Sequence, residues 1–382
     1  MTHKTSHRAR HTLVFSFLLS SLGTLALQGN PALAADLPAF SAEDVFEMEY
    51  ANDPQVSPDG ARVAYVRSAM DIMTDRTRRS IWVVDVDGDN HRPLVSGSGT
   101  FSSPRWSPSG DRLAYLSNTE GKTQLFVQWL DGGETAKVTT LPESPRSIVW
   151  SPDGKHIAFT RFVPSPPPKL ADMPAKPKGA KWAEPATVVD RMTFRFDGGG
   201  YLPTGNQQVF VVPADGGTPR QMTSGDYPIS GSVSWMPDSQ SIIFSSNRRE
   251  DVEYHPRQND LYAASLVTGE LTQMTDHAGP ESDPAVSPNG RYLAYTSAAD
   301  TRQGYNRSDL RIMDLTSGES RSLTADLDRS VSDIQWSANS KDVWIRYNDL
   351  GVARIAEVDL KGNLKQADIV LGGTALGRPY TS

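Results

Sequence analysis

The stretch Trp150-Ser151-Pro152-Asp153-Gly154-Lys155-His156-Ile157-Ala158-Phe159 is the clearest of six copies of one phrase. In each copy an aromatic residue or valine precedes Ser-Pro-Asp-Gly or a variant of it, and an apolar triplet begins six residues after the serine position. The copies begin at Val56, Trp106, Trp150, Trp235, Val286 and Trp336. A phrase that recurs with one internal offset indicates a repeat architecture.

Each copy has the chemistry of a turn between two strands. Proline fixes φ in the turn, Asp or Asn hydrogen-bonds the backbone, and glycine adopts the positive φ. The flanking runs are rich in β-branched and aromatic residues, which favours strands. A third run such as Leu125-Phe126-Val127 and a fourth such as Arg321-Ser322-Leu323-Thr324 follow in the units. Four antiparallel strands in about fifty residues predict one blade of a β-propeller.

Two positions of the phrase indicate how neighbouring blades pack. The alanine that recurs at the centre of the triplets suits a crowded side of the blade. The Trp or Val before the serine position favours packing between blades over a platform for a ligand. A β-sandwich is the competing fold, but a sandwich would not repeat one phrase at one offset. The sequence predicts an all-β propeller of about six four-stranded blades over residues 35–371, with residues 372–382 as the start of a seventh.

The spacing between copies reveals one insertion. The intervals are 50, 44, 85, 51 and 50 residues, which places the insertion, residues 163–205, between the third and fourth copies. Its first part mixes lysines with prolines, a composition that favours extended chain, and its last part reads Arg195-Phe196-Asp197-Gly198-Gly199-Gly200-Tyr201. Such insertions often contact a partner or substrate, but a tolerated surface loop is an equal alternative.

The first 34 residues have the three parts of a secretory signal peptide. A basic stretch from His3 to His11 precedes the apolar run Leu13 to Leu27, and Ala32-Leu33-Ala34 supplies small residues for cleavage. The alternative is a membrane anchor, but the run is shorter than the roughly 20 residues of a span. We therefore expect cleavage after Ala34, a periplasmic location and no membrane span in the processed chain. Ser41 then caps a predicted short helix through Met48.

Composition excludes several classes of partner and site. The formal net charge is −7, and loss of the basic N-terminus makes the chain more acidic, so nucleic acid is an unsuitable partner. The chain has no cysteine, which excludes disulfides and thiolate metal sites.

Several fragments resemble chemical motifs but do not complete them. Gly121-Lys122-Thr123 resembles the end of a phosphate-binding loop, but Leu116 stands where the first glycine is required. Asp85-Val86-Asp87-Gly88-Asp89 resembles a calcium loop, but Asn90 and Ser96 replace the required Gly and Glu. No metal-ligand spacing joins the histidines of the processed chain, His91, His156, His255 and His277. Gly-x-Ser-x-Gly is absent, so we predict no catalytic, cofactor-binding or metal-binding residue in this chain.

The repeats resemble those of TolB-type propellers, and the fuller pattern resembles the N-terminal propeller of the prolyl oligopeptidase family. The acylaminoacyl-peptidase-like and dipeptidyl-peptidase-like members are the most similar, on the lead-in 41–48, the segment 75–82 and the insertion end 195–201. In that family a C-terminal α/β-hydrolase domain supplies a Ser-Asp-His triad, and the propeller restricts entry to peptides. The resemblance leaves no triad position in this chain. It implies a fragment of a longer protein, because stopping inside a blade would expose a sheet edge.

Two functions are compatible with these observations. The first is the substrate-gating propeller of a secreted serine peptidase that acts on oligopeptides, with the hydrolase domain outside this chain. The second is a non-enzymatic, TolB-like periplasmic propeller that binds an envelope protein through its central funnel. A Gly-x-Ser-x-Gly motif in the reading frame after Ser382 would distinguish the first from the second.

Overall fold

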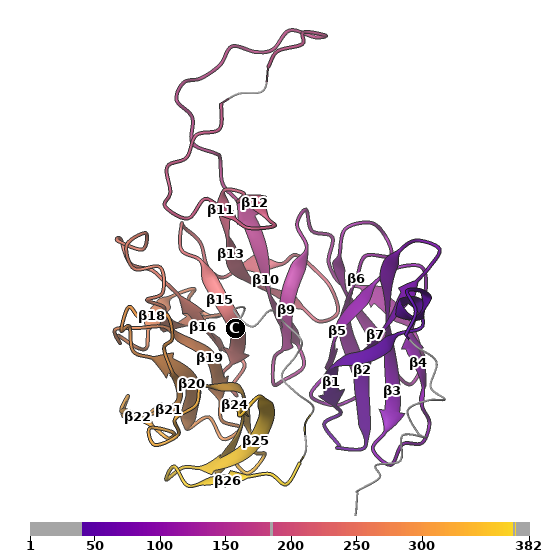
Figure 1. Ribbon diagram of the computed structural model, residues 1–382, viewed down its shortest axis with the longest axis vertical. Coiled ribbons are helices and arrows are strands. Elements are labelled where there is room, and N and C mark those ends of the chain that lie inside the picture. Colours follow the sequence, from indigo (N-terminus) through magenta and orange to yellow (C-terminus); the bar gives the residue numbers. More distant parts are fainter. Residues whose placement is uncertain (1–39, 184–185, 370, 372–382) are drawn as a thin grey trace, which may run out of the picture. The chain divides into compact units, whose positions relative to one another are not determined.

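The computed structural model describes residues 40–183, 186–369 and 371 (Figure 1). In this part of the chain the strands form six four-stranded antiparallel sheets and one two-stranded hairpin. The prediction of an all-β propeller with six four-stranded blades is confirmed. The predicted signal peptide, residues 1–34, and the predicted start of a seventh blade, residues 372–382, lie outside the described residues.

The first three sheets follow the order of the chain, except that the third is interrupted by the insertion. The first contains β1 (Glu49–Val56), β2 (Arg62–Asp71), β3 (Arg76–Asp85) and β4 (Arg92–Val95). The second contains β5 (Phe101–Trp106), β6 (Arg112–Ser117), β7 (Gln124–Trp129) and β8 (Thr135–Lys137). The third contains β9 (Pro145–Trp150), β10 (His156–Pro164), β13 (Gly205–Pro213) and β14 (Arg220–Gln221).

The last three sheets repeat the same up-and-down order. The fourth contains β15 (Ile229–Trp235), β16 (Ser241–Ser246), β17 (Asp260–Ser265) and β18 (Leu271–Gln273). The fifth contains β19 (Glu281–Val286), β20 (Tyr292–Ala298), β21 (Ser308–Asp314) and β22 (Ser320–Ser322). The sixth contains β23 (Val331–Trp336), β24 (Asp342–Asp349), β25 (Val352–Asp359) and β26 (Leu364–Gln366).

Side chains close the turns of the repeated phrase, as the sequence predicted. In the first copy, Ser57 Oγ donates to Asp59 Oδ1 at 2.5 Å, and the same oxygen accepts from the Ala61 backbone N–H at 3.1 Å. These hydrogen bonds favour the charged carboxylate and lower the pKa of Asp59. Gly60 follows with a φ of +73°, which glycine adopts without steric cost.

Two degenerate copies have serine at the glycine position and use its side chain. Ser239 and Ser340 adopt φ values of +59° and +58°, a region that costs free energy for residues with a Cβ. The hydroxyl of Ser239 accepts from the backbone N–H of Asp153 at 3.1 Å, and Ser340 accepts from Asn289 at the same distance. Each bond joins two different sheets and offsets part of the cost of the backbone conformation.

The side chains of each apolar triplet pack against both of the sheets that neighbour their own. Their outer residues pack toward the preceding sheet and their central residue toward the following one, as Leu113, Tyr115 and Ala114 show. Five hydrophobic clusters of described residues each join two consecutive sheets, from the first to the sixth. The small central alanine therefore lies where two sheets meet, which agrees with the prediction of a crowded side.

The two terminal sheets differ from the four between them. β6 and β16 are buried along nearly their whole length, whereas β24 alternates between buried and exposed residues and β2 alternates between buried and half-buried ones. No sixth cluster joins the sixth sheet to the first within the described residues. The central triplet residue of the sixth sheet, Trp344, is correspondingly large and 37% exposed.

The tryptophans of the phrase link neighbouring sheets through the indole N–H. Each donates to a backbone carbonyl of the preceding sheet, over 2.8 to 3.2 Å; the pairs are Trp106–Gln55, Trp150–Arg105, Trp235–Val149 and Trp336–Ala285. The prediction that this position packs between blades is confirmed at these four copies. In the first sheet the same position is Val56, which is 62% exposed.

The predicted helix from Ser41 to Met48 is wrong in extent. The structure has a 3-10 turn, η2 (Glu43–Phe46), without a buried residue, and β1 begins at Glu49. The Ser41 backbone N–H donates to the Asp44 carboxylate at 2.5 Å, whereas the sequence predicted the Ser41 side chain as the cap. So short a segment gains too few hydrogen bonds to extend a helix without a buried face. No helix of the described residues is long and apolar enough to span a membrane.

Candidate functional site

The insertion leaves the third sheet between β10 and β13. These strands pair to their ends, where Pro164 lies opposite Gly205, and Ser165 and Thr204 continue the pairing through a 3.1 Å backbone bond. Gly205 has a φ of +133°, and a Cβ there would collide with the Val163 carbonyl oxygen. Glycine is therefore required where the chain returns to the sheet.

The predicted end of the insertion, residues 195–201, folds as a small hairpin. β11 (Arg195–Phe196) pairs with β12 (Gly200–Tyr201) across the Asp-Gly-Gly turn. The rings of Phe194 and Tyr201 lie 6.1 Å apart, and the Leu202 N–H donates to the Phe194 carbonyl at 2.8 Å. The glycines that marked this segment in the sequence thus form a turn that brings two aromatic rings together.

Polar contacts fasten the insertion to the third and fourth sheets. Arg191 contacts the Asp226 carboxylate at 2.5 Å, and the Asn206 amide donates to the same carboxylate at 2.6 Å. The hydrogen bond from Arg191 is the main cause that lowers the pKa of Asp226. The Met192 N–H donates to Glu253 Oε2 at 2.7 Å, which ties the insertion to the β16–β17 loop.

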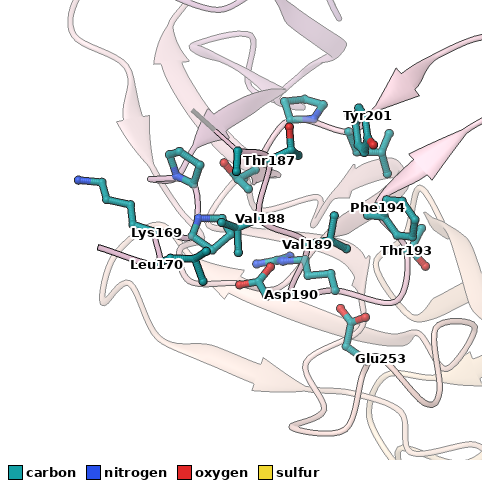
Figure 2. Close-up of a pocket in the computed structure, with 18 of the residues that line it drawn as sticks. Lys169, Leu170, Thr187, Val188, Val189, Asp190, Thr193, Phe194, Tyr201 and Glu253 are labelled. Atoms are coloured by element: carbon teal, nitrogen blue, oxygen red, sulfur yellow. The ribbon is translucent and has the colours of Figure 1, made fainter. Parts of the chain in front are cut away.

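A cavity of about 1120 Å³ lies between the insertion and this loop (Figure 2). Phe194 and Tyr201 lie on one side of it in the view, and Asp190 and Glu253 lie in its lower part. Its apolar lining includes Leu170, Met173, Val188, Val189, Phe194, Val252 and several prolines, and its charged lining is Lys169, Asp172, Asp190, Arg191 and Glu253. This mixture of apolar walls and a few charged groups is typical of a ligand site.

The described lining of the cavity lacks the side chains of nucleophilic catalysis. It contains Thr187, Thr193 and Thr204 but no serine, cysteine or histidine. A threonine without a neighbouring base is a weak nucleophile. The described lining therefore contains no serine, cysteine or histidine that could act as a nucleophile.

Two protein-family models match separate parts of the chain. The TolB beta propeller domain matches residues 60–163, and the dipeptidyl peptidase IV N-terminal region matches residues 181–303. Dipeptidyl-peptidase 5 of Porphyromonas gingivalis is 24% identical over 371 residues, which are 92% of this chain and 53% of that protein. These matches support a β-propeller of the prolyl oligopeptidase and dipeptidyl-peptidase type.

A second curated relative matches a shorter part of the chain. The uncharacterized peptidase YuxL of Bacillus subtilis is 29% identical over 225 residues, 58% of this chain and 33% of that protein. The chain thus spans about half or less of the length of these two curated relatives.

Two solved structures share the fold at low sequence identity. The acylaminoacyl peptidase of Pyrococcus horikoshii has a TM-score of 0.65 at 17% identity, over 86% of this chain and 47% of that one. The propeller domain of the Trilobed protease from Pyrococcus furiosus has a TM-score of 0.58 at 16% identity, over 85% of this chain and 84% of that one.

The fragments that resembled chemical motifs lie in turns of the propeller. Residues 85–89 begin at the last residue of β3 and form a turn, where the Gly88 N–H donates to the Asp85 carbonyl at 2.9 Å. Residues 121–123 connect β6 to β7. His91 lies against the Tyr65 hydroxyl at 2.6 Å, and His255 lies 3.5 Å from Asp251. The described residues contain no group of three or more potential metal ligands among His, Cys, Asp and Glu.

Sequence reasoning missed a buried carboxyl between the fourth and fifth sheets. Glu281, at the start of β19, is 1% exposed, and its Oε2 has no hydrogen-bond partner among the described groups. Burial is the main cause that raises its pKa from 4.5 to about 7. Alignment of the repeats could have identified it, because the first strands of three other sheets begin with an apolar residue, Phe101, Ile229 or Val331, where this strand begins with a glutamate.

Proposed function

We propose that this propeller is the substrate-gating part of a secreted serine peptidase that acts on oligopeptides. In this proposal an α/β-hydrolase domain outside the chain carries the catalytic triad. The relatives named above support a peptidase context, since one is named a dipeptidyl-peptidase and another an acylaminoacyl peptidase. The propeller itself contributes binding and exclusion.

The observation that carries this proposal is the placement of the insertion relative to the strand ends. β10 runs toward the insertion, and the up-and-down order of the sheets places the start of β1 and the end of β26 on that same face. A domain joined to either end of the propeller would therefore leave from the face that holds the cavity. Peptides that reach such a domain from this side would meet the insertion first.

A loop-replacement experiment on the complete gene product tests the gating role. Replacing residues 166–203 by Asn-Gly would join the paired ends of β10 and β13 by a two-residue hairpin turn. The matched control replaces residues 299–307, which connect β20 to β21 at the same face, by the same turn. We expect the first variant to change the dependence of kcat/KM on peptide length, and the control to retain the wild-type dependence.

The complete reading frame provides a separate test of the peptidase assignment. A Gly-x-Ser-x-Gly motif followed by Asp and His, together with hydrolysis of peptide amides, would support it. We expect the 382-residue chain alone to hydrolyse no peptide amide. A gene without such a motif, whose product co-purifies with one stoichiometric envelope protein, would instead support the TolB-like binding function.

Secretion is part of the proposal and has its own test. The basic, apolar and small-residue parts of residues 1–34 support export, with cleavage after Ala34. We expect the protein recovered from a periplasmic extract to begin at Ala35. A product that retains Met1 in the cytoplasmic fraction would refute this location.

A further inference from the structure

The outer part of the insertion, residues 169–183 and called here the insertion tip, is exposed except at Ala180. Figure 1 shows the insertion extending away from the sheets beyond β11 and β12. Three large apolar side chains of the tip are exposed: Trp182 by 41%, and Leu170 by 83% and Met173 by 69%, which also line the cavity described above. Exposed apolar side chains grouped on one projecting segment indicate an interaction surface.

The insertion tip is also basic, in contrast to the chain as a whole. It contains Lys169, Lys176, Lys178 and Lys181 and one acidic residue, Asp172, so its formal charge is +3 while that of the chain is −7. We propose that the insertion tip binds the surface of an anionic lipid bilayer. Lys176, Lys178 and Lys181 would lie among the headgroup phosphates, and Trp182 would enter the boundary with the acyl chains.

The chemistry of the tip fits such a surface in three ways. Each lysine near an anionic bilayer contributes about 1 kcal/mol of attraction. Tryptophan and lysine are side chains that anchor proteins at the membrane–water interface. Pro174 and Pro177 have no backbone N–H, so fewer donors must be satisfied where water is scarce.

A protein partner fits the same segment less well. Lysine is depleted from protein–protein interfaces, whereas four of the fifteen tip residues are lysines. The tip has no helix or strand along its length, and the Ala180 N–H donates to the Pro177 carbonyl in a turn. A bilayer surface, unlike a complementary protein surface, requires no regular backbone shape.

Co-sedimentation of the full chain with vesicles tests the proposal. The probes are vesicles of phosphatidylcholine alone and of an equal mixture with phosphatidylglycerol. We expect binding to the mixed vesicles that weakens between 0.1 M and 1 M NaCl, since screening shortens from about 10 Å to about 3 Å. The triple variant Lys176→Gln, Lys178→Gln, Lys181→Gln should bind about 100-fold more weakly, from about 1 kcal/mol per lysine.

The matched control is the triple variant Lys341→Gln, Lys361→Gln, Lys365→Gln, which removes the same charge from exposed lysines of the sixth sheet. This variant should bind like the wild type. All variants retain the apolar N-terminal run, and binding to vesicles of phosphatidylcholine alone measures its contribution separately. Equal binding by the tip variant and the wild type would overturn the proposal. Absence of wild-type binding to the mixed vesicles would also overturn it. In that case, retention of the protein on beads coated with polyglutamate would indicate that the tip binds an acidic protein surface.

Discussion

The carboxyl of Glu281 provides a sharp test of the packing between the fourth and fifth sheets. Burial is the largest cause that raises its pKa to about 7, and the neighbouring Asp260 adds to the rise. Thr275 donates a hydrogen bond and Arg311 supplies positive charge, and both oppose the rise without cancelling it. The native state therefore favours the protonated, neutral carboxyl.

The shift has a defined effect on stability. The pKa rises from 4.5 to about 7, and each unit corresponds to about 1.4 kcal/mol, so the whole shift is worth about 3 kcal/mol. Between these two values the native state binds the proton and the unfolded state releases it. The contribution of Glu281 to the free energy of unfolding is thus fully present below about pH 4.5 and is lost as the pH rises through about 7.

The substitution Glu281→Gln removes this titration and keeps the size of the side chain. Urea unfolding, followed by tryptophan fluorescence from about pH 5 to about pH 8, gives the free energy of unfolding of each protein. Relative to the wild type, the variant should gain about 2.5 kcal/mol across this range, because part of the titration lies below pH 5. The control Glu319→Gln changes an exposed glutamate of the same sheet and should follow the wild-type profile. A constant difference between Glu281→Gln and the wild type at every pH would refute the reasoning.

Three further substitutions test the contacts between and within sheets. Ser340→Ala keeps the strained φ and removes the acceptor for the Asn289 N–H, so it should lower the free energy of unfolding by about 1 to 2 kcal/mol. Ser340→Gly should be nearly neutral, and urea unfolding compares the two variants. Trp336→Phe removes an indole N–H bond between sheets and should cost at least about 1 kcal/mol, more than Trp344→Phe at the half-exposed face. Gly205→Ala should lower the thermal midpoint by several degrees, and an unchanged midpoint would contradict the steric argument.

Much of the fold could be predicted because the repeated turns are specified by residues close together in the chain. Proline, aspartate and glycine at fixed positions specify the turn, as Asp59 and Gly60 show, and the turn fixes where two strands meet. The spacing also located the insertion, whose pairing strands end at Pro164 and begin at Gly205. These features depend on neighbours in the chain, so one sequence suffices to find them.

The candidate site could be predicted only as a segment. Nothing local indicates that Arg191 meets Asp226 or that Glu253 binds the Met192 N–H, because these partners are separated by tens of residues in the chain. The cavity exists because those contacts hold the insertion against the β16–β17 loop. The short helix predicted after Ser41 failed for the opposite reason, since its local signals found no buried face to extend along.

The sequence by itself determined the blade: its turns, the order of its four strands and the alternation of the apolar triplet. The tertiary structure decided which face of each blade is buried, because burial depends on whether another sheet stands beside it. The same triplet position holds Ala114 between two sheets and Trp344 at a partly exposed face. The tertiary structure also decided that burial outweighs the nearby positive charge of Arg311 at Glu281, since the free energy of a carboxyl depends on everything packed around it in three dimensions.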